Sequence, residues 1–167
     1  KNNFSFIIII YTMTELTELL SNIDLKYYAK LFRIPLINVL SKDIYNKIKP
    51  QKGCYIINLQ DSDNGNGSHW TALIITDKNA LYFDSFGISI PSDILHFIWR
   101  YNKKSSVIYS IDGIQSIKSV YCGWYCIYFL YFITVQHNKN KNYRYLMNKH
   151  NSIYNLDTKY LNDRILK

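Results

Sequence analysis

The chain has 167 residues, of which 48% are hydrophobic and 19% are charged. A chain of this length can bury the core of one domain, and this composition excludes a disordered tail. The formal net charge is +8 and the isoelectric point is near 9.3, which favours polyanionic partners such as DNA, RNA or anionic lipid. The abundant Lys, Asn, Ile and Tyr of an AT-rich genome would produce the same charge, and the lysines form no compact motif.

The three cysteines narrow the chemistry. An odd, small number argues against a secreted disulfide scaffold and favours a reducing compartment. A structural zinc site needs four Cys or His ligands in paired spacings, whereas only Cys122 and Cys126 are close in sequence and Cys54 stands alone. The chain also lacks a C-x-x-C redox motif. The thiols therefore remain candidates for nucleophilic catalysis or for packing.

The N-terminal segment has an unusual composition. It lacks a first Met and carries an apolar run at residues 4–11, which is shorter than the roughly 20 residues that span a bilayer. It also lacks a signal-peptide cleavage site. We expect residues 1–13 to be a non-native or peripheral leader and residues 14–167 to form a single domain that starts at or near Met13. The alternative is a processed fragment whose leading segment packs as an edge strand.

The first half of that domain mixes helix and strand patterns. The spacing of the apolar residues Leu16, Leu19, Leu20 and Ile23 predicts one or two short helices over residues 14–32, with Ser21 and Asp24 as a start signal. An irregular connection is expected between Pro35 and Pro50. Residues 54–59 form a buried-strand pattern, and the composition of residues 61–68 predicts a loop.

The second half begins with a predicted hairpin. Strands are expected at residues 70–76 and 80–84, joined by a turn at 77–79. Further patterns predict a helix at 91–101, a strand at 106–111, an apolar helix at 122–135 that is too short to span a membrane, and helices at 143–150 and 155–166. One α+β domain is the simplest account of these elements.

Two polar residues lie at the open end of the predicted hairpin. His69 immediately precedes the first strand, and Asp84 ends the second strand 15 residues later. Antiparallel pairing brings the outer ends of two such strands together, so we expect these side chains to be neighbours. A carboxylate in this position can accept an imidazole N–H and stabilise the protonated ring.

Cys122 lies where a loop is expected to give way to the apolar helix. Backbone N–H groups and the helix dipole at that end favour a thiolate, and we expect Gly123 to leave space beside the sulfur. Taken singly, a His at a strand start, an Asp at a strand end and a Cys in an apolar helix are most often structural. Together they are a plausible base, orienting acid and nucleophile. We interpret Cys126 and Cys54 as packing residues.

Three sequence segments resemble a known protease family. "GSHWTAL", "YFDSFG" and "IQSIKSVYCGWYC" together resemble the adenovirus-type (adenain-like) maturation proteases, over roughly residues 50–135. These enzymes are related to the SUMO-deconjugating proteases and to proteases of virophages, Polinton-like elements and large DNA viruses. The resemblance implies a papain-like cysteine protease fold of the adenain type, with a mixed central sheet packed by helices and the catalytic Cys at a helix N-terminus.

The resemblance also implies a role for each motif residue. It makes His69 the base, Asp84 the third member of the triad, Gln115 the oxyanion-hole donor and Cys122 the nucleophile, with Trp70 and Gly123 as flanking motif residues. The Gln-to-Cys separation of 7 positions looks more like the viral enzymes than the deconjugating ones.

The chain departs from the adenoviral pattern in two places. Asp84 stands where the adenoviral enzymes carry Glu, although Asp is common elsewhere in the family. The adenoviral enzyme is joined to a peptide activator by a disulfide, whereas no cysteine lies between Ser89 and Gln115 here. A peptide activator of this chain would therefore not be disulfide-tethered. Activation by DNA binding through a basic surface stays open.

The implied function is a cysteine endopeptidase. By resemblance it would cleave after small or Gly residues in capsid or scaffold precursors during virion maturation, in the virion or the host cytoplasm or nucleus, with no membrane association and with neither a metal nor an organic cofactor. Three alternatives stay open: a deconjugating protease for a ubiquitin-like modifier, an acetyltransferase on a related Cys-His-acid site, and a non-enzymatic capsid or DNA-binding protein that keeps the fold.

Overall fold

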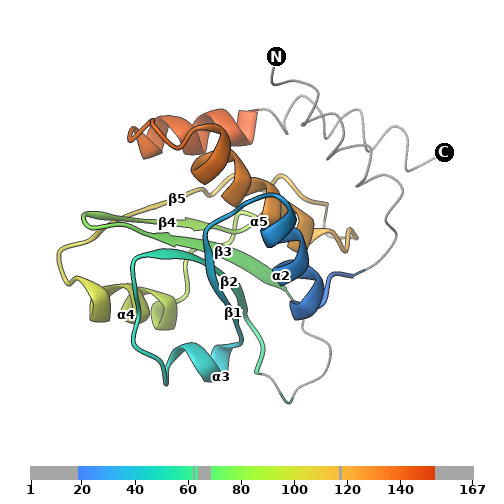
Figure 1. Cartoon of the computed structure of the whole chain (residues 1–167), viewed down its shortest axis with the longest axis horizontal. Coiled ribbons are helices and arrows are strands. Elements are labelled where there is room, and N and C mark those ends of the chain that lie inside the picture. Colours follow the sequence, from blue (N-terminus) through green and yellow to red (C-terminus); the bar gives the residue numbers. More distant parts are fainter. Residues whose placement is uncertain (1–18, 62, 64–68, 117, 153–167) are drawn as a thin grey trace.

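A five-stranded mixed sheet forms the centre of the protein (Figure 1). The structure is a computed structural model that describes residues 19–61, 63, 69–116 and 118–152. The strands lie in the sheet in chain order: β1 (Leu36–Leu40), β2 (Gly53–Asn58), β3 (Trp70–Ile75), β4 (Asn79–Phe83) and β5 (Ser106–Tyr109). The central three strands are antiparallel, and each outer strand pairs in parallel with its neighbour. The predicted α+β class with a mixed central sheet is confirmed.

Helices cover both faces of this sheet (Figure 1). The helical elements are α2 (Asn22–Leu31), α3 (Lys42–Tyr45), α4 (Ser92–Tyr101), α5 (Cys122–Tyr131), the π-helical segment η1 (Phe132–Gln136) and a helix over residues 143–152. One face carries α2, α5 and the helix at 143–152, and the other carries α3 and α4. No helix in the described ranges is both long and apolar enough to cross a bilayer.

Strand alternation divides the apolar residues between two core clusters. In β2, Cys54 and Ile56 pack toward α5, whereas Tyr55 and Ile57 pack toward α4. This follows from the two-residue period of a strand, which sends successive side chains to opposite faces. The two-sided burial also explains why β2, β3 and β4 read as continuous apolar runs. Almost every residue of α5 is buried, as its all-round apolar sequence predicted.

The prediction of an irregular connection between Pro35 and Pro50 was wrong. This region contains the edge strand β1 and the short helix α3. A register shift between Leu36 and Asn38 interrupts the pairing of β1 with β2. The strand therefore lacks a regular alternation of buried and exposed residues. Its existence depends on pairing with a distant segment, which propensity does not encode.

The start of α2 was predicted correctly, but its buried face was not. Ser21 and Asp24 form a capping box in which each side chain accepts from the other residue's backbone N–H. Ile23, which we expected on the apolar face, is 74% exposed, whereas Leu25 and Ala29 are buried. The predictions for residues 1–13 and 155–166, and those for most of the loop at 61–68, concern positions outside the described residues.

Candidate active site

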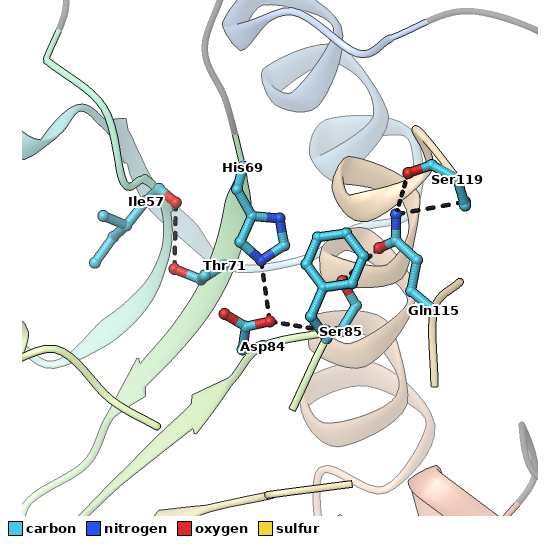
Figure 2. A network of polar contacts seen from close by, with 8 residues as sticks. Ile57, His69, Thr71, Asp84, Ser85, Gln115 and Ser119 are labelled. Atoms are coloured by element: carbon cyan, nitrogen blue, oxygen red, sulfur yellow. Dashed lines mark hydrogen bonds and ion pairs between the residues drawn. The ribbon is translucent and has the colours of Figure 1, made fainter. Parts of the chain in front are cut away.

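His69 and Asp84 meet at one end of the β3–β4 hairpin. His69 lies immediately before β3 and Asp84 immediately after β4. The antiparallel register, in which Ala72 is opposite Phe83, brings both flanking residues to the same edge. The Nε2 atom of His69 lies 3.0 Å from Oδ1 of Asp84 (Figure 2). The neighbourhood expected from the hairpin is therefore present in the structure.

The same oxygen of Asp84 also holds the turn that follows β4. Its Oδ1 atom accepts the backbone N–H of Phe86 at 2.8 Å, which fixes the carboxylate relative to the chain. The Phe86 ring packs against the imidazole of His69, with ring centroids 4.6 Å apart. Because Asp84 is fully buried, neither its orientation nor that of the imidazole is free to vary.

The electrostatics of His69 are dominated by two neighbouring groups. His69 is only 8% exposed, and burial alone would lower its pKa. Hydrogen bonding and charge from Asp84, and then from Cys122, outweigh burial and raise the pKa of His69 to about 9. Since Asp84 occupies Nε2, Nδ1 is the ring nitrogen left for the thiol of Cys122.

Cys122 is the first residue of α5 and is buried, with 5% of its surface exposed. The preceding residue, Tyr121, provides no side-chain cap, so the backbone N–H groups of the first turn keep their hydrogen-bonding capacity. The N-terminal end of a helix stabilises negative charge through these groups and through the dipole. The position therefore suits a thiolate nucleophile and, later, an oxyanion.

The other two thiols, Cys54 and Cys126, lie in the core between the sheet and α5. Burial raises the pKa of Cys54 to about 12, and it raises the pKa of Cys126 well above its ordinary value. A buried thiol that stays protonated is a poor nucleophile. Both residues belong to the apolar cluster around α5, in agreement with their interpretation as packing residues.

Gly123 has a different role from the one we expected. A Cβ at this position would lie 3.1 Å from Cβ of Leu20 and 3.3 Å from Cδ2 of Leu25. The space beside Gly123 is therefore filled by the segment that leads into α2. The indole N–H of Trp70 donates to the carbonyl of Leu20 at 3.0 Å, so Trp70 and Gly123 both hold that segment against the site.

Gln115 lies on the connection between β5 and α5 and is almost fully buried. Its Nε2 atom donates to the carbonyl of Ser119 at 2.8 Å, and its Oε1 atom accepts from the hydroxyl of Ser85 at 2.5 Å (Figure 2). The side chain is thus held between the turn after β4 and the residues just before Cys122. This position near the start of α5 is compatible with an oxyanion donor.

The turn after β4 packs directly on the backbone of the β5–α5 connection. Gly87 has a φ of +72°, and a Cβ there would lie 2.6 Å from both the backbone nitrogen of Gly113 and the carbonyl oxygen of Ile111. Only glycine tolerates both the conformation and the close approach. This contact brings Ser85 to Gln115, a partnership that sequence reasoning missed.

The described residues contain no cluster of three His, Cys, Asp or Glu side chains that could hold a metal ion. The groups that the structure brings together are a charged imidazole, a buried carboxylate, a thiol at a helix start and an anchored amide. These are the parts that covalent acyl transfer requires: a base, its orienting acid, a nucleophile and an oxyanion donor. Their catalytic roles stay predictions.

The overall fold is similar to that of a solved viral protease. The ASFV pS273R protease matches with a TM-score of 0.50 and 16% sequence identity, over 79% of this chain and 62% of that protein. A Se-Met form of the same protease matches with a TM-score of 0.31 and 18% identity, over 56% of this chain and 43% of the other. The chain thus spans less than two thirds of that protease's length.

No protein-family model matches the chain, and a search of curated proteins finds no match. At 16% identity the likeness to the ASFV protease shows a shared fold and agrees with the predicted papain-like class. The more specific resemblance to the adenovirus-type enzymes rests on the three sequence motifs and stays a prediction.

Proposed function

We propose that this protein is a cysteine endopeptidase with a Cys122–His69–Asp84 triad and a Gln115 oxyanion hole. The observation that carries the proposal is the state of His69. The imidazole is buried, it is bonded through Nε2 to a carboxylate, and its pKa is raised to about 9 by that carboxylate together with Cys122. A histidine in this state is protonated at neutral pH and stabilises a neighbouring thiolate.

The first half of the reaction is acylation of the enzyme. The Cys122 thiolate attacks the carbonyl carbon of the scissile peptide, forming a C–S bond while the carbonyl π electrons move to oxygen. The oxyanion is bound by Nε2 of Gln115 and by the backbone N–H of Cys122. His69 then gives its proton to the amine nitrogen, the C–N bond breaks and an acyl-thioester remains.

The second half reverses the proton transfer. His69, now neutral, takes a proton from water as the water oxygen attacks the thioester carbonyl. The C–S bond breaks, the acid is released and the thiolate returns beside the imidazolium. Throughout the cycle Asp84 keeps its negative charge and holds the imidazole in one orientation. Each oxyanion donor contributes about 10²–10³-fold in rate.

The proposed substrates are viral capsid or scaffold precursors, cleaved after small or Gly residues during virion maturation. The sequence motifs support this choice, and the fold shared with an ASFV protease agrees with it. On the same basis we propose action in the virion or in the host cytoplasm or nucleus. A basic chain of net charge +8 is compatible with activation by DNA, and a peptide activator would bind without a disulfide.

The test is cleavage of a library of internally quenched peptides with Gly or Ala before the scissile bond. We expect wild-type protein to cleave members of this library and to lose activity on alkylation with iodoacetamide. Cys122→Ala should abolish both cleavage and alkylation. Cys126→Ala, one helical turn away, is the matched control and should keep the activity. Cleavage by Cys122→Ala at the wild-type rate would disprove the proposal.

A further inference from the structure

The hydroxyl of Ser85 forms a hydrogen bond with the side-chain amide oxygen of Gln115. Ser85 is fully buried in the turn after β4, and its Oγ atom lies 2.5 Å from Oε1 of Gln115 (Figure 2). The backbone carbonyl of Ser85 also accepts the N–H groups of Ile114 and Gln115, at 2.9 and 3.0 Å. One buried serine thus holds both the main chain and the side chain of the candidate oxyanion donor.

The direction of these hydrogen bonds can be assigned from the partners. The Ser119 carbonyl can only accept, so the amide end that faces it at 2.8 Å must be Nε2. The opposite end, Oε1, can only accept, so Ser85 must be the donor. Nε2 carries two hydrogens, and Ser119 takes one. The other has only the Ser119 hydroxyl at 3.4 Å, a long contact, and remains for a substrate oxygen.

We infer that Ser85 is a positioning residue for catalysis, which orients and polarises the Gln115 amide so that its second N–H meets the oxyanion. This inference rests on the proposed function. Donation to an amide oxygen withdraws charge from the group and strengthens its N–H as a donor. Without the Ser85 hydroxyl, the buried Oε1 atom of Gln115 has no donor, and this favours rotation of the amide toward another donor.

The sequence order around Asp84 gains a physical meaning from this assignment. Asp84 orients the base, Ser85 orients the oxyanion donor, Phe86 packs on the imidazole, and Gly87 allows the backbone approach that joins the two loops. A four-residue turn thereby sets the positions of the base and the amide relative to one another.

The primary test is Ser85→Ala, assayed with the best peptide of the quenched library. We expect kcat to fall by about 10-fold, a part of the 10²–10³-fold that one oxyanion donor supplies, with KM nearly unchanged. The rate of alkylation of Cys122 by iodoacetamide should be unaffected, because alkylation develops no oxyanion. Ser85→Thr keeps the hydroxyl and should recover most of the rate.

A matched control separates positioning from packing. Ser105 is also a buried serine, and its hydroxyl makes no hydrogen bond with any described residue. Ser105→Ala should therefore leave kcat unchanged. If Ser85→Ala does not fold, Ser85→Cys, which keeps the volume but is a weak donor, replaces it, with the same expected loss.

A double-mutant cycle distinguishes failure of this inference from failure of the proposed function. Gln115→Ala should lower kcat by about 10²-fold, and adding Ser85→Ala to it should cause no further loss, because Ser85 acts through Gln115. If Gln115→Ala slows cleavage but Ser85→Ala does not, the Ser85 inference is wrong and the oxyanion hole stands. If neither slows cleavage, the oxyanion role of Gln115 is wrong.

A spectroscopic measurement tests the contact even in the absence of turnover. The two side-chain N–H signals of Gln115 in a ¹⁵N-labelled sample should be well separated and slow to exchange in the wild type. In Ser85→Ala they should move together and exchange faster, whereas Ser105→Ala should leave them in place. Unchanged Gln115 signals in Ser85→Ala would overturn the inference.

Discussion

Two buried histidines have pKa values that are shifted in opposite directions. Burial pushes the pKa of both His69 and His150 downward. His69 has a carboxylate and a thiol beside it, and its pKa rises to about 9. His150 has the neutral amide of Asn151 on Nδ1 at 3.0 Å, and burial lowers its pKa to about 4. The groups beside a buried imidazole therefore decide whether it is a cation at neutral pH.

The surroundings of His150 explain the difference. Its ring is stacked on Tyr128 with centroids 5.3 Å apart, and it meets the edges of Phe83, Phe129 and Phe132. This aromatic cluster lies between α5 and the helix at 143–152. The neutral ring of His150 packs as one more aromatic group in the core, whereas we propose that the ring of His69 takes part in catalysis.

The largest expected effect comes from making the environment of His69 resemble that of His150. Asp84→Asn replaces the carboxylate with a neutral amide, so the imidazolium loses its stabilising charge. We expect kcat to fall by about 10³–10⁴-fold, measured on the quenched peptides. Asp84→Glu should restore part of the rate. Asp112→Asn removes an exposed carboxylate and should have little effect, and a wild-type rate for Asp84→Asn would mean that the acid has been misassigned.

The second expected effect is an alkaline limit on cleavage. His69 must be protonated to stabilise the thiolate and to give a proton to the leaving amine, so kcat/KM should decline as pH rises through about 9. The stability that His69 contributes follows the same sign. It is complete below about 6.5, the ordinary pKa, and is lost as pH rises through about 9. In Asp84→Asn the residual activity should decline at a lower pH, and an unmoved limit would assign the titration to another group.

The third expected effect is a loss of stability in acid that depends on His150. The pKa of His150 is about 4 in the folded protein and about 6.5 in the unfolded chain. Stability is therefore complete above about 6.5 and is lost as pH falls toward 4, by about 3 kcal/mol. Denaturant unfolding at several pH values should show this loss.

The variant that tests the acid effect is His150→Phe, which removes the titrating group but keeps an aromatic ring. It should lower stability at neutral pH, because the Oδ1 atom of Asn151 loses its partner His150, but its stability should vary less between pH 6.5 and 4 than that of the wild type. Parallel pH profiles for the two proteins would contradict the assignment. His69 does not interfere, since it is protonated in both states below about pH 6.

The smallest expected effect comes from making His150 resemble His69. Asn151→Asp places a carboxylate beside Nδ1, and the pKa of His150 should rise by about one to three pH units, followed by NMR titration of the ring protons. Asn148→Asp adds the same charge at an exposed position of the same helix and should leave the pKa of His150 nearly unchanged. Equal effects of the two variants would mean that long-range charge, rather than the contact, controls His150.

The parts of the site that depend on local pairing were predictable from the sequence. A short hairpin places its flanking residues together, so the proximity of His69 and Asp84 could be predicted from the strand patterns alone, whereas their roles rest on the resemblance. The start of α5 at Cys122 could be assigned from an apolar run after a loop. The strand β1 could not be predicted in this way. It is defined by its pairing with β2, which follows only after a connecting segment.

Contacts between distant segments were also beyond the sequence patterns. Ser85 and Gln115 are 30 residues apart, and no periodicity relates them. Gly123 was interpreted through its neighbour Cys122, whereas its actual constraint is Leu20, about a hundred residues earlier in the chain. The one available indication for Ser85 was that a small polar residue separates Asp84 from an aromatic ring and a glycine, a pattern that cannot name its partner.

The burial of Cys54 and Cys126 has a practical consequence for counting molecules. All three cysteines are free, but two have a pKa raised by burial, so an alkylating reagent should modify one thiol in each folded chain. Incorporation of one label would then measure the fraction of competent molecules in a preparation. The second and third labels can react only when the core opens, so their rate of incorporation reports how often the folded protein opens.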